Sequence, residues 1–223
     1  MRQTVTLLGD YFYYSFVLIS LVTVLAVLFT PARDFVIADF YRQLDTNGQK
    51  RALAAFDEKL DNIGLTRAEF SPQILIRKRN REMLVLSDDL IVASYPVSLG
   101  RAPLGIKLRG NDMKTPEGQY YICTKIEGHR YHLFLQINYP SPDDAKRGAV
   151  QQIIRPGEEA RIEAAWQQTQ PPPTDTALGG PVGIHGFGAE TNWTTDGSIG
   201  LHNIHIEELF WNIATGTSVA IIP

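Results

Sequence analysis

Cysteine is nearly absent from this chain of 223 residues, and with Cys123 alone no disulfide can form within it. Cys123 stands in a run that is typical of a strand, residues 120–125, and we expect it to be a small buried hydrophobe. His202 and His205 are three residues apart, but a structural zinc site normally needs several Cys or His ligands. We therefore expect solvated or capping histidines beside a pocket, no metal and no cofactor.

Blocks of like charge are also missing. The net charge is −3, and no acidic or basic run stands out. A nucleic-acid surface usually needs a basic stripe, so we expect no nucleic-acid partner. The apolar content of 44% is typical of a globular core, and the length suits one domain of ordinary size plus an appendage.

Charge is absent altogether from residues 11–32, which are largely apolar. Such a segment is long enough to span a bilayer as a helix. A cleaved signal peptide is the alternative, but residues 28–32 fit a small-x-small cleavage site poorly. We expect residues 1–33 to be a cytoplasmic tip and an uncleaved transmembrane anchor.

A helical pattern follows the apolar segment. Apolar side chains recur at helical spacing over residues 34–63, with a break or bend expected at Asn47-Gly48. We therefore expect residues 34–70 to form a helical juxtamembrane stalk, with a docking helix pair as the alternative.

From Ser71 onward the pattern becomes one of short strands separated by turns, which is typical of a β-sandwich or barrel. We expect a mainly β domain with short helices over residues 71–223. The expected strands are residues 74–77, 83–86, 90–95, 120–125, 131–138 and 218–222, and the expected helices include residues 158–168 and 207–211.

Glycine turns near the C-terminus carry the chemistry. His185-Gly186 is followed thirteen residues later by Ser198, which stands in the run Thr195-Asp196-Gly197-Ser198. A Lys-Thr-Pro-x-Gly-x-Tyr turn at residues 114–120 and a terminal Gly-Thr-x-Val segment at residues 216–219 complete the pattern. Over about residues 72–223 this layout resembles the L,D-transpeptidase catalytic domain (YkuD-type) family, whose nucleophile is a Cys where this chain has Ser198.

The resemblance implies a role for each matching residue. His185 is the base, the carbonyl of Gly186 orients it, and Gly197 with the amide of Ser198 helps to form an oxyanion hole. The family analogy also places Tyr139, Trp193, Thr195 and Asp196 along a sugar or peptide groove.

The serine leaves three interpretations of the site open. The first is a natural loss of the cysteine that leaves a wall-binding pseudoenzyme. The second is a working or weakened enzyme that uses the serine, and the third is an engineered Cys→Ser substitution. Ser–His catalysis usually also needs an orienting acid, and the sequence does not show whether Asp196 reaches His185.

The implied substrate is a peptidoglycan stem peptide or a peptide-linked lipoprotein. The expected location is the inner membrane, with a single pass and the C-terminal domain in the periplasm. Acyl transfer or amide hydrolysis, a silent scaffold subunit of an envelope complex, and a different transferase on the same fold all fit the sequence.

Overall fold

The computed structural model describes residues 32–188, 193–194 and 196–223. Its contacts divide the chain into two units, residues 1–48 and 49–223, and the second holds the sheet and the candidate site. No helix among the described residues is long and apolar enough to cross a membrane. The expected anchor, residues 11–32, lies outside the described residues except for its last one.

Helix α2, Ala32–Asn62, runs through Asn47-Gly48, where the sequence predicted a break or bend. A glycine in a helix interior costs only about 1 kcal/mol relative to alanine, which packing elsewhere can offset. That packing is present in the second unit, where Phe56 and Leu60 are fully buried in the main core. Residues 49–62 are thus packed on the compact domain, as the docking alternative for this helical region expects.

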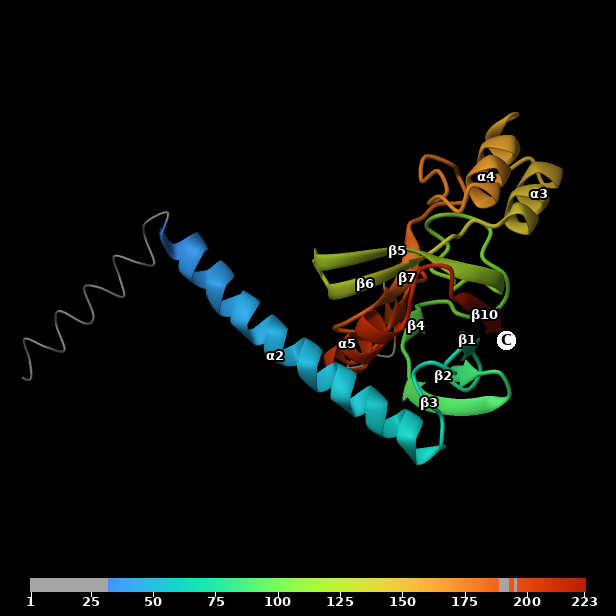
Figure 1. Cartoon of the computed structure of the whole chain (residues 1–223). Coiled ribbons are helices and arrows are strands. Elements are labelled where there is room, and N and C mark those ends of the chain that lie inside the picture. The colour runs from blue at the N-terminus through green and yellow to red at the C-terminus, as the bar shows by residue number, and fades with distance from the viewer. Residues whose placement is uncertain (1–31, 189–192, 195) are drawn as a thin grey trace, which may run out of the picture. The chain divides into compact units, whose positions relative to one another are not determined.

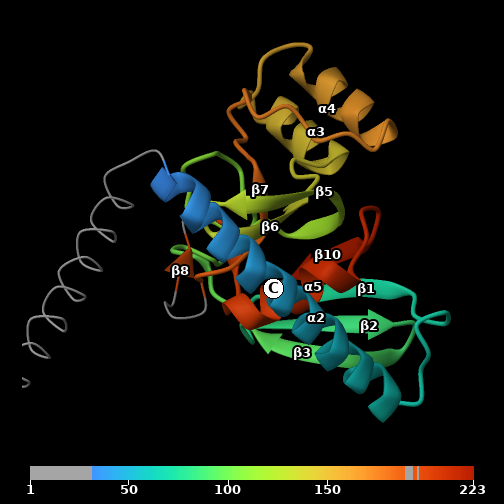
Figure 2. The same cartoon turned by 60° about the vertical axis from the view of Figure 1, so that its left-hand side comes forward.

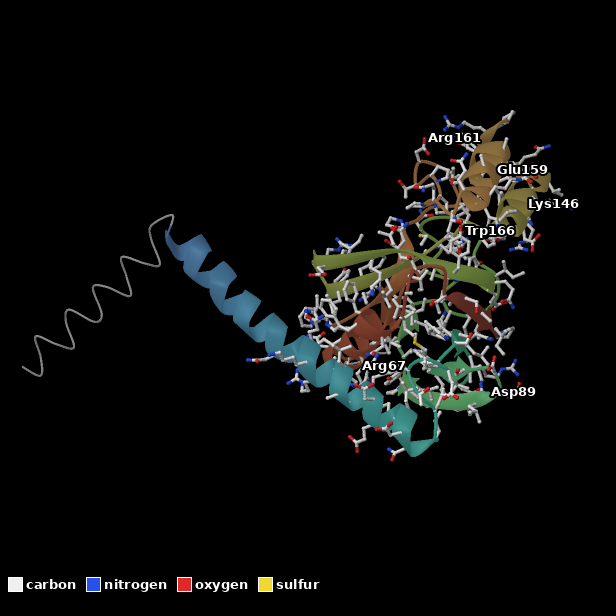
Figure 3. All side chains as sticks on the ribbon, in the orientation of Figure 1. Arg67, Asp89, Lys146, Glu159, Arg161 and Trp166 are labelled. Carbon is white, nitrogen blue, oxygen red and sulfur yellow. The ribbon has the colours of Figure 1, made fainter. Side chains whose placement is uncertain are left out.

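Helix α5, Asn203–Asn212, is tied to this second half of α2. Lys59 donates to Glu208 at 2.6 Å, and Arg67 donates to Asn212 at 2.7 Å. Arg67 follows α2 and also donates to the Leu53 carbonyl at 3.2 Å, and Figure 3 shows it by α5. These contacts fix where α5 lies, and Asn203 at the start of α5 in turn accepts a hydrogen bond from the Phe187 amide at 2.9 Å.

The strands form one mixed sheet of eight, in the order β3-β2-β1-β10-β5-β6-β7-β9, and a small pair, β4 and β8. The strand bounds are Pro72–Arg77 (β1), Glu82–Ser87 (β2), Leu90–Pro96 (β3), Leu99–Gly100 (β4), Gly118–His129 (β5), His132–Ile137 (β6), Val182–His185 (β7), Trp193–Thr194 (β8), Ile199–Gly200 (β9) and Ser218–Ile222 (β10). The large sheet is a mixed half-barrel, accompanied by short helices as the sequence predicts.

Two parallel pairings bring distant segments together. The last strand, β10, lies beside β1, with Val219 opposite Ile74, and also pairs with β5. At the other end of the sheet β9 lies parallel to β7, with Gly200 opposite His185. This second pairing places the two glycine turns of the sequence side by side.

Two short helices pack together at one end of the second unit, beyond β5 and β7 (Figures 1 and 2). They are α3, Pro142–Val150, and α4, Glu158–Gln167. Ser141 and Asp144 form a capping box at the start of α3. A small separate core lies beneath these helices, formed by Ala145, Ile154, Ile162 and Leu178.

Candidate active site

His185 ends strand β7, and its side chain is buried. Its Nδ1 lies 2.6 Å from the carbonyl oxygen of Gly186. A carbonyl can only accept, so Nδ1 carries the proton and Nε2 is left as the acceptor. Nε2 is buried and has no hydrogen-bond partner among the described residues. This is the tautomer that a general base needs.

Aromatic rings cover His185. The Tyr131 ring stacks on it at 4.6 Å between centroids with an interplanar angle of 24°, and the Phe134 ring lies 6.5 Å away. Burial lowers the pKa of His185; the hydrogen bond to Gly186 opposes this, and the charges of His129 and Arg130 add to it. The ring is therefore neutral, and able to accept a proton, at neutral pH.

The His-Gly turn has no room for a side chain at Gly186. A Cβ there would lie 2.5 Å from Oδ1 of Asn203 and 3.0 Å from the carbonyl oxygen of Tyr131. The same neighbours hold the turn: the Gly186 amide donates to Tyr131 O at 3.0 Å, and Asn203 accepts from the Phe187 amide at 2.9 Å. The carbonyl that orients His185 is thus fixed by the hairpin on one side and by α5 on the other.

Ser198 immediately precedes β9, the strand that pairs with β7. Its hydroxyl accepts a hydrogen bond from the Gly183 amide at 3.4 Å. Ser198 and His185 line the same cavity, which has a volume of about 530 Å³. The structure therefore brings the two predicted residues to one site.

The turn before Ser198 is unusual in its backbone. Gly197 has φ = +99°, and a Cβ there would lie 1.8 Å from the carbonyl oxygen of Lys114. Asp196, with φ = +52°, is exposed and also lines the cavity. The Nδ1 position that an orienting acid would occupy is taken by the Gly186 carbonyl, so Asp196 does not orient His185.

The cavity also contains residues that the sequence did not single out for the site. One part of its wall is the tip of the β5–β6 hairpin, where Arg130 lies over the Tyr131 ring at 4.7 Å. His129, at the end of β5, also lines the cavity. The remaining lining residues are Gly110, Asn111, Phe134, Ala177, Gly179, Gly180, Pro181 and Val182. The β5–β6 hairpin and the segments before β5 and β7 come together at His185 only through tertiary packing, and short sequence motifs carry no signal of it.

Tyr139 does not lie along this cavity, contrary to the expectation. It is 1% exposed, its hydroxyl donates to the Leu178 carbonyl at 3.0 Å, and its ring packs against Tyr120. An aromatic residue before a proline can pack in a core as well as line a groove, and Tyr139 packs in the core. Trp193 begins β8 beside Leu99.

Three other predictions concern residues near the site. Thr195 lies outside the described residues. His202 is the N-cap residue of α5 but makes no side-chain cap bond, and His205 packs against Tyr95 with ring centroids 4.8 Å apart. Within residues 32–188 and the described C-terminal segments, no three His, Cys, Asp or Glu side chains gather as a metal site would require.

Known proteins are similar to this chain over most of its length. A Bacillus subtilis protein named as an L,D-transpeptidase, YqjB, is 28% identical over 153 residues, which are 67% of this chain and 70% of that protein. The solved structure of Bd1075 from Bdellovibrio bacteriovorus is 21% identical, covers 70% of this chain and has a TM-score of 0.45. The helical cell shape determining protein Pgp2 of Campylobacter jejuni is 20% identical, covers 74% and has a TM-score of 0.47.

This chain spans 49% of the Bd1075 chain and 54% of the Pgp2 chain, about half of each. The sequence profile of the L,D-transpeptidase catalytic domain matches residues 71–221, well over half of the chain. The chain belongs to the L,D-transpeptidase catalytic domain (YkuD) family.

Proposed function

We propose that this protein binds peptidoglycan stem peptides and catalyses acyl transfer or amide hydrolysis on them, with His185 as base and Ser198 as nucleophile. The observation that carries the proposal is the state of His185. Its Nδ1 is held by the Gly186 carbonyl at 2.6 Å, while its buried Nε2 has no partner in the described part of the chain. A buried ring nitrogen without a partner, lining a cavity with a hydroxyl, is what general-base activation of that hydroxyl requires.

The cavity suits a peptide that carries both charges. Its volume of about 530 Å³ lies within the usual range for ligand sites, roughly 300–1,000 Å³. Arg130 and His129 line it together with Asp196. A diaminopimelate-containing tetrapeptide has carboxylates for the Arg130 guanidinium and an ammonium group for the Asp196 carboxylate. Burial and the charge of Arg130 lower the pKa of His129, so this residue offers a neutral ring that forms hydrogen bonds.

In the first step Ser198 Oγ attacks the carbonyl carbon of the donor peptide bond, and His185 Nε2 takes the hydroxyl proton. The carbonyl oxygen becomes an oxyanion, which the amides around Gly197 and Ser198 are expected to stabilise. The carbon–nitrogen bond then breaks, His185 returns the proton to the leaving amine, and an ester to Ser198 remains.

In the second step an acceptor amine or water attacks the ester carbonyl. His185 Nε2 removes a proton from the incoming group and then gives it to Ser198 Oγ as the ester bond breaks. Amine attack gives a new cross-link, whereas water gives a shortened peptide. Both outcomes use the same two side chains.

Catalytic silence is the second candidate function. A hydroxyl is a poorer nucleophile than a thiolate, and the group that orients His185 is a neutral carbonyl, where Ser–His enzymes use an acid worth about 10⁴ in rate. A chain with this site can retain stem-peptide binding and serve as a scaffold in an envelope complex.

We also propose that residues 11–32 anchor the protein in the inner membrane, with the domain in the periplasm. The uncharged apolar run supports the anchor, and the location of stem peptides supports the orientation.

Turnover of purified tetrapeptide muropeptides, followed by liquid chromatography and mass spectrometry, tests the proposal. The unchanged chain should release or exchange the terminal residue, and His185→Ala should slow this by roughly 10²–10⁴-fold. Ser198→Ala should abolish the covalent step. Binding of muropeptides without any turnover by the unchanged chain would favour the scaffold over the enzyme.

A further inference from the structure

Lys107 is a buried cation beside the candidate site, and its side chain is 1% exposed. Its ammonium group donates to the carbonyls of Arg109 at 3.0 Å and Gly110 at 3.3 Å, to Asp112 Oδ1 at 2.8 Å and to the carbonyl of Asp196 at 3.1 Å. An ammonium group carries three protons, so these four acceptors leave none of them without a hydrogen bond. A charge this deeply buried is tolerated only because it is fully paired.

The Lys107–Asp112 pair organises a segment that has no regular secondary structure. Besides Lys107, the Asp112 carboxylate accepts from the amides of Leu108 at 2.7 Å, Arg109 at 3.0 Å and Lys114 at 3.1 Å. Burial opposes these bonds, but together they hold the pKa of Asp112 below its ordinary value. The part of the segment around residues 107–114 is therefore folded around this ion pair.

The same segment touches the site in two places. Gly110 and Asn111 line the cavity. The turn before Ser198 lies against the other end of the segment, since a Cβ on Gly197 would lie 1.8 Å from the Lys114 carbonyl oxygen. Lys107 joins the two places, because it bonds both Gly110 and Asp196.

We propose that Lys107 is a positioning residue, which holds the Asp196 carbonyl and so fixes the turn that presents the hydroxyl of Ser198 to His185. It acts through the backbone and touches no substrate. The inference rests on the proposed function, since it gives the turn a catalytic meaning.

Lys78 offers a matched control. Its side chain is 2% exposed, and its ammonium group donates to the carbonyls of Gly105 at 3.0 Å and Thr115 at 2.8 Å and to Glu117 Oε1 at 2.8 Å. It therefore holds the same irregular segment with the same kinds of bond. Unlike Lys107, it bonds no atom of residues 196–198 in the part of the chain that the structure describes.

The test uses one reporter thiol, introduced by Ser198→Cys in a full-length chain that also carries Cys123→Ala. Lys107→Met and Lys78→Met are added separately, and the rate of alkylation by iodoacetamide is measured across a range of pH centred on about 8.5, the ordinary pKa of a thiol. Amide exchange of residues 196–200 is measured in the same proteins.

We expect the parent thiol to titrate below about 8.5, because His185 Nε2 can take the thiol proton and the resulting imidazolium then stabilises the thiolate. Lys107→Met should raise that pKa, lower alkylation at neutral pH by about tenfold for each unit of the shift, and speed amide exchange at residues 196–198. Lys78→Met should leave both readouts near the parent values, even where it lowers the melting temperature by a similar amount.

Equal changes in the two lysine variants would reduce Lys107 to a structural role and overturn the proposal. A folded Lys107→Met protein with an unchanged thiol pKa would overturn it too. An ordinary thiol pKa in the parent would instead refute the His185 pairing, and with it the catalytic meaning of the turn. Should Lys107→Met fail to fold, Asp112→Asn, which keeps the shape of the segment, is tested in its place. A smaller rise of the thiol pKa in this variant supports the proposal. An unchanged thiol pKa in this variant overturns the proposal.

Discussion

Replacing Gly197 by alanine should damage this protein more than the same change at Gly216, although both glycines have similar backbones. Their φ angles are +99° and +89°. A Cβ at Gly216 would meet nothing within 4 Å, whereas a Cβ at Gly197 would lie 1.8 Å from the Lys114 carbonyl oxygen. Comparing Gly197→Ala with Gly216→Ala therefore separates the cost of a strained backbone from the cost of a steric clash.

The magnitudes follow from these distances. At Gly216 the alanine costs the strain of a left-handed residue, roughly 1–2 kcal/mol, partly offset because alanine restricts the unfolded chain. Real Cβ contacts essentially never fall below 3.0 Å, so at Gly197 the two groups must separate by about 1.2 Å. Forcing atoms into a packed site costs about 1–3 kcal/mol more. A displacement of about 1 Å at the nucleophile can also lower the rate by roughly 10²-fold.

Urea unfolding of the two full-length variants measures the difference in stability, and muropeptide turnover measures the displacement of the turn. Gly197→Ala should lose about 3 kcal/mol and most of its activity, while Gly216→Ala should lose about 1 kcal/mol and keep its activity. Equal losses of stability, or full activity in Gly197→Ala, would refute the reasoning that the turn is pressed against Lys114.

Three further predictions test other parts of the account. Because burial lowers the pKa of His185, the acid limb of the pH profile of kcat/KM should lie below pH 6.5. The free energy of unfolding should fall as pH drops from about 6.5 towards the folded pKa, because in this range the unfolded state binds more protons than the folded state. Titration of His185 and unfolding curves at several pH values check the direction of the pKa shift and of the stability change. Phe56→Ala should cost about 3–5 kcal/mol in urea unfolding because the ring is fully buried, whereas Val150→Ala, at a side chain 78% exposed, should change stability by less than about 0.5 kcal/mol. Protease added to spheroplasts should digest the domain if residues 11–32 are an uncleaved anchor, and protection until the inner membrane is lysed would contradict that topology.

Most of the strands could be predicted from the sequence because their signals are local. Alternation and turn residues located β1 (Pro72–Arg77) and β10 (Ser218–Ile222) to within about two residues. Their parallel pairing could not be predicted, because Ile74 and Val219 are far apart in the chain and nothing in either segment names its partner. The choice between a sandwich and a half-barrel depends on such pairings.

The site divides in the same way. The glycine turns marked His185 and Ser198, because Gly is costly where no special backbone is needed. Tyr131, which covers His185, and Lys107, which holds the next turn, lie in ordinary runs of sequence and reach the site only through tertiary packing. Tyr139 was instead predicted for the groove from its residue type, but its side chain is buried in the core.

Mass spectrometry after exposure to a carbapenem tests the central claim most directly, that His185 and residue 198 form a base–nucleophile pair. Three full-length chains are compared: the unchanged chain, Ser198→Cys, and Ser198→Cys with His185→Ala. The unchanged chain also reveals any adduct on Cys123. The account predicts a covalent adduct at position 198 that forms fastest in Ser198→Cys and is lost or strongly slowed without His185. A folded Ser198→Cys protein that forms no adduct, or one that forms it equally well without His185, would contradict the account.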